Sequence, residues 1–259
     1  MAFEFDGEKY KKVSSHQKEW GKRIIAEFEF KGNEHILDLG CGDGILTAQL
    51  ADMVPNGYVL GIDTSKGMID SAIKNKKPNL EFRLLNINQI DFKERFDLVF
   101  SNATLHWTKD HKKLLSNIYN ALKVDGIARF NFAADGNCSH FFKVVREVMN
   151  LEKFAYYFKD FEWPWYMPQV EEYETLAKTF AFKEVKVWGE NADRYFNNVD
   201  DMIGWIEQPS IVPFLEYLVD DTLKRVFRNL VVDKMIKETL QEDGRCFETF
   251  RRVNLFARK

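Results

Sequence analysis

Residues 34–44, which read EHILDLGCGDG, constrain the fold of this chain most strongly. The segment begins with an apolar run typical of a buried strand, continues into three glycines at alternate positions, and leads into a helical pattern over 45–53. Glycines are needed in such a turn because it visits backbone angles that a Cβ forbids, and because a ligand must approach bare N–H groups at the positive end of the helix. An ordinary turn explains one glycine but not three. The segment therefore predicts a nucleotide-sized binding site between a strand and a helix.

Length, charge and hydropathy indicate a cytoplasmic globular protein. The chain has 259 residues, 45% of them hydrophobic, which suffices for one large α/β domain or a domain with a sizeable insertion. Its formal net charge of -3 argues against a general nucleic-acid or anionic-membrane binder. No apolar run approaches the roughly 20 residues of a membrane span, and the first ten residues carry three acids and no apolar signal segment. We expect a monomer or homodimer that binds a small molecule, with neither a nucleic acid nor a membrane as partner.

The cysteines and histidines give no support to metal catalysis. Cys41, Cys138 and Cys246 are odd in number and far apart, which is typical of reduced thiols in a cytoplasm. Neither these cysteines nor the five histidines show metal-ligand spacing. We therefore predict that no metal is bound.

Strand and helix patterns alternate without interruption up to residue 132. A helical pattern at 10–30 precedes the first strand, and further strands are expected at 57–63, 80–87, 96–101 and 127–132, with helices at 65–72 and 110–122. This alternation predicts an α/β fold with a parallel, doubly wound sheet and right-handed crossovers.

The pattern changes after Cys138, where aromatic residues become dense and no strand is expected before Glu172. We interpret this region as a mostly helical cap over the strand ends, whose aromatic residues either line an apolar pocket or form the cap's own core. Further helices are expected at 173–180, 199–206 and 214–239, and strands at 182–188 and 252–257. The expected division is 1–137 for the N-terminal helix and core, 138–172 for the cap, and 173–259 for the rest of the core with further helices.

The acid that ends the second strand narrows the choice of ligand. Asp63 follows the glycine turn by about 20 residues, a position that suits a ribose diol. A nicotinamide site would show G-x-G-x-x-G, whereas Ile45 occupies the place of the last glycine. Asp38, just before the turn, would repel a pyrophosphate but attract a sulfonium or ammonium cation. These features favour S-adenosylmethionine as the cofactor.

Several motifs carry a family resemblance that extends along nearly the whole chain. DLGCGDG at 38–44 and GIDTSKGM at 61–68 resemble the first two motifs of class I S-adenosylmethionine-dependent methyltransferases. NATLHW at 102–107, LKVDG at 122–126, WIEQPSIVPFL at 205–215 and FRRVNLFARK at 250–259 are similar to the trans-aconitate methyltransferase group. YxxxSSxQ at 10–17, together with LHW at 105–107, resembles juvenile hormone acid methyltransferases. The resemblance implies a seven-stranded sheet of order 3-2-1-4-5-7-6, with the last strand antiparallel and a substrate cap after strand five.

The resemblance also implies a cofactor site, in which Asp63 holds the ribose, and Asp38, Gly40 and Gly42 hold the methionine part. Where the family usually has an aspartate on the adenine this chain has Asn86, so that contact loses its charge. Met68 either packs on the adenine or belongs to the core. The implied cofactor-binding residues are Tyr10, Asp38, Gly40, Cys41, Gly42, Asp63, Thr64, Met68, Asn86, Ile87 and Asn102.

The acceptor is expected to be a carboxylate, which needs placement and exclusion of water but no general base. Gln17 and Trp107 are the predicted orienting N–H donors, and both match the carboxyl-methylating pattern. His106 is either a structural imidazole or, if the acceptor is instead carbon, nitrogen or a phenol, the candidate base. The acceptor is either a polar tricarboxylate or an apolar fatty or isoprenoid acid. An alternative function is that of a non-catalytic module that binds S-adenosylmethionine or S-adenosylhomocysteine. The candidate substrate residues are Trp165, Arg194, Tyr195 and Trp205.

Overall fold

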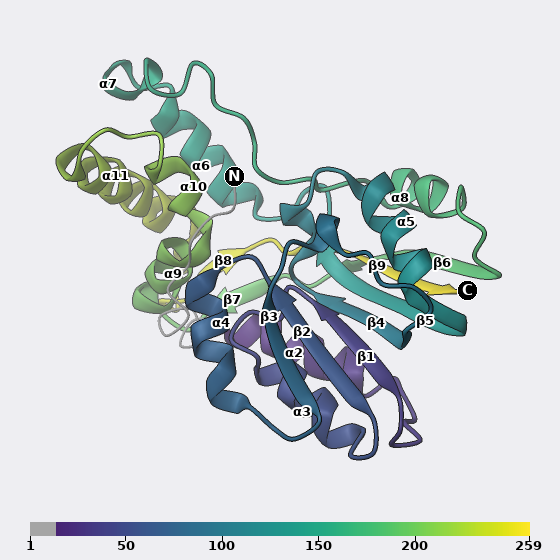
Figure 1. The fold of residues 1–259 in the computed structure, drawn as a ribbon. Coiled ribbons are helices and arrows are strands. Elements are labelled where there is room, and N and C mark those ends of the chain that lie inside the picture. Colours follow the sequence, from purple (N-terminus) through teal and green to yellow (C-terminus); the bar gives the residue numbers. More distant parts are fainter. Residues whose placement is uncertain (1–13) are drawn as a thin grey trace. The chain divides into compact units, whose positions relative to one another are not determined.

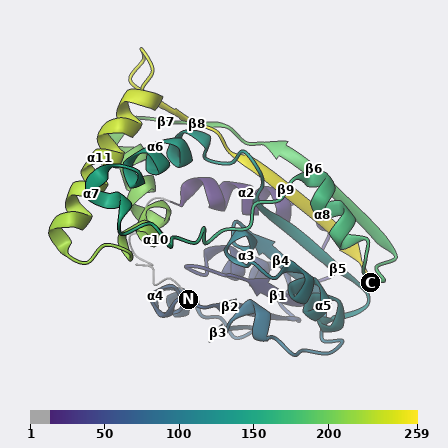
Figure 2. The same ribbon diagram turned by 90° about the horizontal axis from the view of Figure 1, so that it is seen from above.

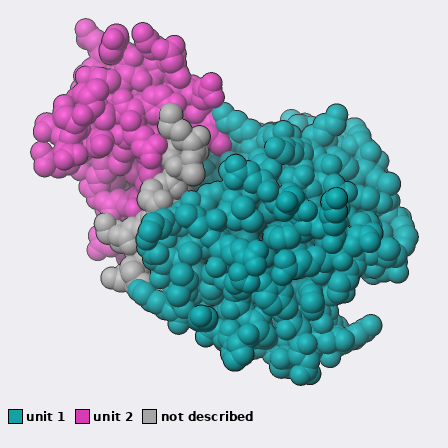
Figure 3. All heavy atoms as spheres, viewed as in Figure 1, with its two compact units in different colours: residues 1–135, 165–190, 252–259 teal, residues 136–164, 191–251 magenta. Residues whose placement is uncertain are grey.

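The computed structural model describes residues 14–259 and consists of two compact units (Figures 1 and 3). Unit 1 contains the described residues up to Asp135 together with 165–190 and 252–259, and unit 2 contains 136–164 and 191–251. This division differs from the expected one because the helices of 199–239 group with the region that follows Cys138, whereas 165–190 groups with the sheet. Each unit is described by itself.

A seven-stranded sheet forms the centre of unit 1. Side by side, its strands are β3 (Leu80–Leu84), β2 (Tyr58–Asp63), β1 (His35–Leu39), β4 (Phe96–Asn102), β5 (Leu122–Ala133), β9 (Arg251–Arg258) and β6 (Glu184–Asn191). The first five strands in this order pair in parallel, and β9 pairs antiparallel with β5. The expected order 3-2-1-4-5-7-6 with an antiparallel last strand is therefore confirmed, β9 being the seventh strand of this sheet along the chain.

Helices cover both faces of this sheet (Figures 1 and 2). Because alternate strand residues point to opposite faces, Leu37 packs in a cluster with α5 (His111–Ala121) and α8 (Val170–Ala177), whereas Ile36 packs with α2 (Ser15–Ile25) and α3 (Ile45–Met53). Helix α4 (Lys66–Ala72) packs next to β2 and β3. It is capped by Ser65, whose side chain accepts a hydrogen bond from the N–H of Met68. The carboxyl ends of β1, β2, β4 and β5 thus meet along one edge, where parallel α/β folds place their ligands.

Unit 2 is helical except for a small antiparallel pair, β7 (Arg194–Phe196) with β8 (Cys246–Glu248). Its helices are α6 (Ser139–Met149), α7 (Glu152–Ala155), α9 (Val199–Trp205), α10 (Val212–Leu215) and α11 (Asp221–Thr239). The prediction of a single helix at 214–239 was wrong. Asp220 adopts an extended backbone there, and its side chain caps a new helix by accepting a hydrogen bond from the N–H of Leu223 at 2.8 Å.

Aromatic side chains form the core of unit 2. Phe141, Phe154, Phe214 and Phe227 are each no more than 1% exposed. The rings of Phe154 and Phe227 meet edge to face with centroids 5.1 Å apart, and Phe161 stacks on Phe214 at 5.0 Å. These phenylalanines therefore form the core of unit 2 itself.

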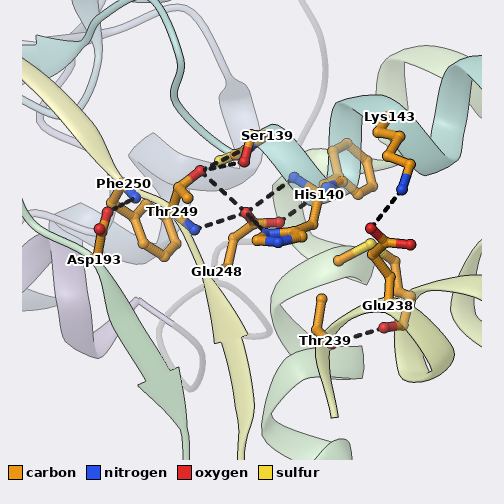
Figure 4. Close-up of polar contacts among 12 residues, drawn as sticks. Ser139, His140, Lys143, Asp193, Glu238, Thr239, Glu248, Thr249 and Phe250 are labelled. Atoms are coloured by element: carbon orange, nitrogen blue, oxygen red, sulfur yellow. Dashed lines mark hydrogen bonds and ion pairs between the residues drawn. The ribbon is translucent and has the colours of Figure 1, made fainter. Parts of the chain in front are cut away.

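A buried carboxylate joins β8 to the start of α6 (Figure 4). Glu248 is fully buried, and its carboxylate accepts from the backbone N–H groups of Phe141 at 2.9 Å and Thr249 at 2.7 Å. The His140 ring Nδ1 lies 2.9 Å from the same carboxylate. These bonds satisfy N–H groups at the beginning of α6 and place a negative charge at its positive end. Within residues 14–259, no helix is both long and apolar enough to cross a membrane.

Candidate functional site

The glycine turn, residues 40–44, connects β1 to α3 and is bonded to the end of β2. The N–H groups of Gly40 and Cys41 both donate to the carbonyl oxygen of Ile62, at 2.8 and 2.9 Å. Gly40 has φ +73°, and a Cβ there would lie 2.0 Å from Thr104 Cγ2. Glycine is therefore required at this position for its backbone angle and for the close approach of the loop after β4.

Asp63 lies beside the turn, as the sequence predicted. One carboxylate oxygen accepts from the N–H of Gly42 at 3.0 Å, and the other accepts from the N–H of Ser65 at 2.9 Å. Thr64 lies between these contacts, at the junction of β2 and α4. Met68, on α4, is 5% exposed and belongs to the buried residues of that helix. The two assignments for Met68, adenine contact and core residue, stay predictions.

Asp38 places a second carboxylate beneath the turn. It is 2% exposed, and its Oδ2 accepts from the Thr47 hydroxyl at 2.7 Å. Burial, with a contribution from the negative charge of Asp63, raises the pKa of Asp38 to about 7, against the lowering effect of the Thr47 bond. Burial and the charges of Asp63, Asp38 and Asp43 together raise the pKa of Cys41 well above its ordinary value. The acidic surroundings favour a cationic ligand at the turn.

The end of β3 presents Asn86 and Ile87. The Asn86 side-chain oxygen accepts from the N–H of Asn88 at 2.8 Å and so caps the short helix Ile87–Gln89. Ile87 is 6% exposed. Because the Asn86 oxygen already has a partner, its contact with an adenine stays a prediction.

Asn102 ends β4 and contacts helix α2. Its Nδ2 donates to the backbone oxygen of Gln17 at 2.7 Å. Asn102 is 8% exposed, and its Oδ1 is buried with no hydrogen-bond partner among residues 14–259. The Gln17 Oε1 is likewise buried without a partner in this part of the chain. Unsatisfied buried amide oxygens are rare in folded proteins and mark this place as a candidate ligand contact.

The loop after β4 carries His106 and Trp107 on a short helix, Leu105–Trp107. The His106 carbonyl oxygen accepts from the N–H of Tyr166 at 2.8 Å, and the Trp107 ring lies 5.2 Å from the ring of Trp165. Burial, and then the positive charge of Arg252, hold the pKa of His106 well below its ordinary value, so the imidazole is neutral near pH 7. His106, Trp107 and Trp165, all predicted for the acceptor site, thus lie close together.

A buried histidine on α5 holds this loop in place. His111 Nε2 lies 3.0 Å from the backbone oxygen of Leu105, and Nδ1 lies 3.1 Å from the Tyr173 hydroxyl. Burial lowers the pKa of His111 to about 4, so the bonds are made by a neutral ring. Sequence reasoning did not assign this residue, since its partners are distant along the chain.

Arg252, at the start of β9, is a second residue that sequence reasoning left unassigned. It is 3% exposed, its Nε donates to Asn131 Oδ1 at 2.9 Å, and its guanidinium lies 4.4 Å from the centre of the Trp20 ring. Asn131 is the register partner of Asn102 on the neighbouring strand. A second buried arginine, Arg129 on β5, is paired through two bonds of 2.8 Å with the carboxylate of Glu27. The FRRVNLFARK motif contained the signal, because it places an arginine at the start of the last strand.

The remaining predicted substrate residues belong to unit 2. Tyr195 on β7 is 46% exposed, with the Arg245 guanidinium 4.4 Å from its ring centre. Arg194 precedes it on the same strand, opposite Glu248. Trp205 is 3% exposed and packs 5.7 Å from the ring of Phe250. Contacts of these three residues with a substrate stay predictions.

Tyr10 lies outside the described residues. Cys41, Cys138 and Cys246 are buried and form no disulfide bond with one another. Over residues 14–259, no three His, Cys, Asp or Glu side chains are grouped so that they would hold a metal ion.

Comparison with known proteins identifies the family of this chain. A family model described as a methyltransferase domain matches residues 30–196, which is more than half of the chain. The chain is 32% identical over 134 residues to a malonyl-[acyl-carrier protein] O-methyltransferase of Acetivibrio thermocellus, a match that covers 51% of this chain and 47% of that relative. In that match the chain spans about half the length of the relative.

A longer match is with the trans-aconitate 2-methyltransferase of Escherichia fergusonii, 26% identical over 246 residues and covering 91% of this chain and 90% of that one. Among solved structures, phosphoethanolamine N-methyltransferase 2 of Haemonchus contortus in complex with S-adenosyl-L-methionine superposes with a TM-score of 0.61. It is 21% identical, and the match covers 98% of this chain and 56% of that chain. This structure shares the fold.

Proposed function

This chain belongs to the methyltransferase domain family, and from that premise we propose that it transfers a methyl group from S-adenosylmethionine to a carboxylate oxygen of a small organic acid. The observation that carries the proposal is a difference in charge along one edge of the sheet. Asp38 and Asp63 lie in or beside the glycine turn, where Asp43 is paired with Lys18 at 2.9 Å, whereas Arg252 lies at the ends of β5 and β9. A cationic methyl donor and an anionic acceptor fit these two regions.

The residues at the acidic region fit the cofactor. Asp38 and Asp63 supply negative charge for a sulfonium or ammonium group, and the turn leaves no side chain at Gly40 that would obstruct its approach. When bound, the cofactor supplies a methyl group activated by the positive sulfur. Asp63 would bind the ribose after yielding its bond to the N–H of Gly42. The orphaned oxygen of Asn102 is a further polar atom that a bound ligand would satisfy.

At the other region, this chain's residues would orient the acid. Trp107 offers an indole N–H, and Gln17 a side-chain amide, to the carboxylate oxygens. Arg252 adds a buried positive charge. A carboxylate is already a nucleophile near pH 7, so the neutral His106 need not remove a proton. Catalysis then rests on placement and on exclusion of water, which supply roughly 7 to 11 kcal/mol in favourable systems.

The names of two relatives support this acceptor class. One relative is a trans-aconitate 2-methyltransferase and the other is an O-methyltransferase of malonyl-[acyl-carrier protein]. Incubation of the protein with methyl-labelled cofactor and a panel of organic acids tests the proposal. We expect label in at least one acid, and transfer to amines or phenols with none to acids would contradict it.

One observation favours a second candidate, methylation of a phenol or an amine. The His106 Nδ1 is buried, and within 14–259 no residue bonds to it, so a neutral imidazole is placed to accept a proton. His106→Asn separates the candidates through the pH dependence of kcat/KM. A general base predicts loss of an ionisation on the acidic limb, whereas an orienting role predicts an unchanged pH profile.

A further inference from the structure

The loop that follows β4 begins in a conformation that its own residues do not favour. Ala103 has φ +56°, in the left-handed region that residues with a Cβ rarely adopt. Its N–H donates to the backbone oxygen of Asn131 at 2.7 Å. Strained backbone of this kind persists only where the surrounding structure holds it, and it is found most often at functional sites. The elements packed around this loop therefore decide where His106 and Trp107 lie.

His111 of α5 is one of these supports, and both nitrogens of its ring are bonded. The backbone oxygen of Leu105 lies 3.0 Å from Nε2 and can only accept, so Nε2 carries the ring proton. Burial lowers the pKa of His111 to about 4, against the raising effect of the backbone oxygens of Leu105 and Thr108, so the ring is neutral near pH 7. Nδ1 is then an acceptor, and the Tyr173 hydroxyl, 3.1 Å away, donates to it.

The segment 165–173, which ends in the first turn of α8, contacts the same loop at a second point. The N–H of Tyr166 donates to the backbone oxygen of His106 at 2.8 Å, and the Tyr166 ring lies 4.6 Å from the ring of His111. Tyr173 is fully buried. The short helix of the loop is thus bonded both to α5 and to this segment, and all three belong to unit 1.

We propose that His111 and Tyr173 are positioning residues for methyl transfer, and that their two hydrogen bonds place Trp107 against the acceptor. This inference rests on the proposed function, in which Trp107 orients the acid. A displaced loop would misplace the acceptor, and a small error in the placement of reacting groups slows a reaction strongly. The glycine turn is bonded instead to the end of β2, so it should keep its shape and its affinity for the cofactor.

Two substitutions at His111 separate its two bonds. The amide nitrogen of glutamine takes the place of Nε2, so His111→Gln keeps a donor to Leu105. The asparagine side chain is one bond shorter and its amide takes the place of Nδ1, so His111→Asn keeps a partner for Tyr173 but does not reach Leu105. The measurements are kcat and KM with the best acid of the panel, and calorimetric affinity for S-adenosylmethionine, with the full chain.

We expect His111→Asn to lower kcat by about 10- to 100-fold while cofactor affinity stays unchanged. His111→Gln should keep kcat within about threefold of that of the unaltered protein. Tyr173→Phe removes only the hydroxyl and should lower kcat by about 3- to 10-fold. Equal losses of kcat in the glutamine and asparagine variants, or a loss of cofactor affinity as large as that of kcat, would overturn the inference.

Ile118→Val is the matched control, because Ile118 is a fully buried residue of α5 about two turns from His111. It should lower the midpoint of thermal unfolding without changing kcat. A loss of kcat as large as that of His111→Asn would contradict the proposal, since any weakening of α5 would then have the same effect.

The position of the ring proton is tested on the unaltered protein, without an acceptor, by NMR correlation of the imidazole nitrogens with the ring protons. We expect the proton of His111 on Nε2, and a proton on Nδ1 would overturn the inference. If the protein methylates amines or phenols and no acid, the proposed function fails. The comparison of kcat among the same variants, made with that acceptor, still decides whether His111 and Tyr173 position the loop.

Discussion

The two regions along the carboxyl edge of the unit 1 sheet differ in charge. Beside the glycine turn, the ends of β1 and β2 place two aspartates, and Asp43 of the turn is paired with Lys18 at 2.9 Å. Beside the ends of β4 and β5, the polar groups are amides, a neutral imidazole and the guanidinium of Arg252. A methyl transfer that joins a cation to an anion needs this arrangement, and it needs no dedicated acid–base pair. Under the proposed function, this difference in charge would direct the donor and the acceptor to different places along one sheet edge.

Both regions also contain a buried group whose charged form is disfavoured. Burial raises the pKa of Asp38 to about 7 and holds the pKa of His106 well below its ordinary value. A ligand cation at the first region restores the charge of Asp38, whereas a ligand anion at the second meets Arg252. The predictions below test whether each region acts on its own ligand.

The largest effect is expected from Gly40→Ala, which should disrupt the acidic region. The new Cβ would lie 2.0 Å from Thr104 Cγ2 at a φ of +73°. Backbone strain and overpacking together should lower the free energy of unfolding by about 2 to 5 kcal/mol, measured by urea denaturation. Cofactor affinity should fall with it, as measured by calorimetry.

Gly244→Ala is the matched control in unit 2. Its φ of +84° imposes similar backbone strain, but no atom of the described residues lies within 4 Å of the added Cβ. We expect a loss of about 1 to 2 kcal/mol in the free energy of unfolding and unchanged cofactor affinity. Equal losses for the two variants would show that the contact with Thr104 is unimportant.

Arg252→Gln should disrupt only the region at the ends of β4 and β5. Loss of a charged hydrogen-bonding partner predicts a rise of about 10- to 100-fold in KM for the acid, with little change in cofactor affinity. The pKa of His106 should also rise, because Arg252 lowers it in the intact protein. Steady-state kinetics and NMR titration measure these effects.

Arg129→Gln provides the comparison for that variant, since Arg129 is also a buried arginine of the sheet and its partner is Glu27 of the same unit. It should lower stability without raising KM for the acid. A rise in KM of the same size in both variants would indicate a general loss of structure.

A pH titration of cofactor binding tests Asp38. A bound cation lowers the pKa of this carboxyl from about 7, so binding releases a proton and affinity rises with pH up to about 7 and then levels off. From pH 7 to pH 6 we expect calorimetry to show about a fivefold loss of affinity. Asp38→Asn should bind more weakly and without this pH dependence, and an unaltered pH profile in that variant would exclude Asp38 as its source.

The smallest effect is expected from Trp107→Phe, which removes one N–H donor and keeps an aromatic ring against Trp165. Loss of one hydrogen bond predicts a fall in kcat/KM of about 3- to 10-fold, with cofactor affinity unchanged. Steady-state assays with the best acid measure it. A fall in cofactor affinity of the same size would show that Trp107 acts on the cofactor and not on the acid.

The sequence predicted the strand, the glycine turn, the helix after it and the acid that ends β2, because these signals are local. Three glycines, the acid before them and Asp63 at the next strand end lie within 26 residues, and each follows from the turn or the charge that it must provide. The parallel, doubly wound sheet followed from the alternation of patterns, and its strand order followed from the family resemblance.

The group of side chains at the ends of β4 and β5 was harder to predict because its members are brought together only by folding. Arg252 lies 121 residues after Asn131, its hydrogen-bond partner, and His111 contacts a tyrosine 62 residues away. The break at Asp220 was missed because apolar residues continue on both sides of it, and the pair β7 and β8 because three-residue strands carry little pattern.

The most direct test of the account is the base stability of the transferred methyl group. The protein is incubated with methyl-labelled S-adenosylmethionine and an acid from the panel, and the product is treated with mild base. We predict that nearly all of the label is released as methanol, because a methyl ester hydrolyses. Label that stays with the acceptor after this treatment would contradict transfer to a carboxylate oxygen.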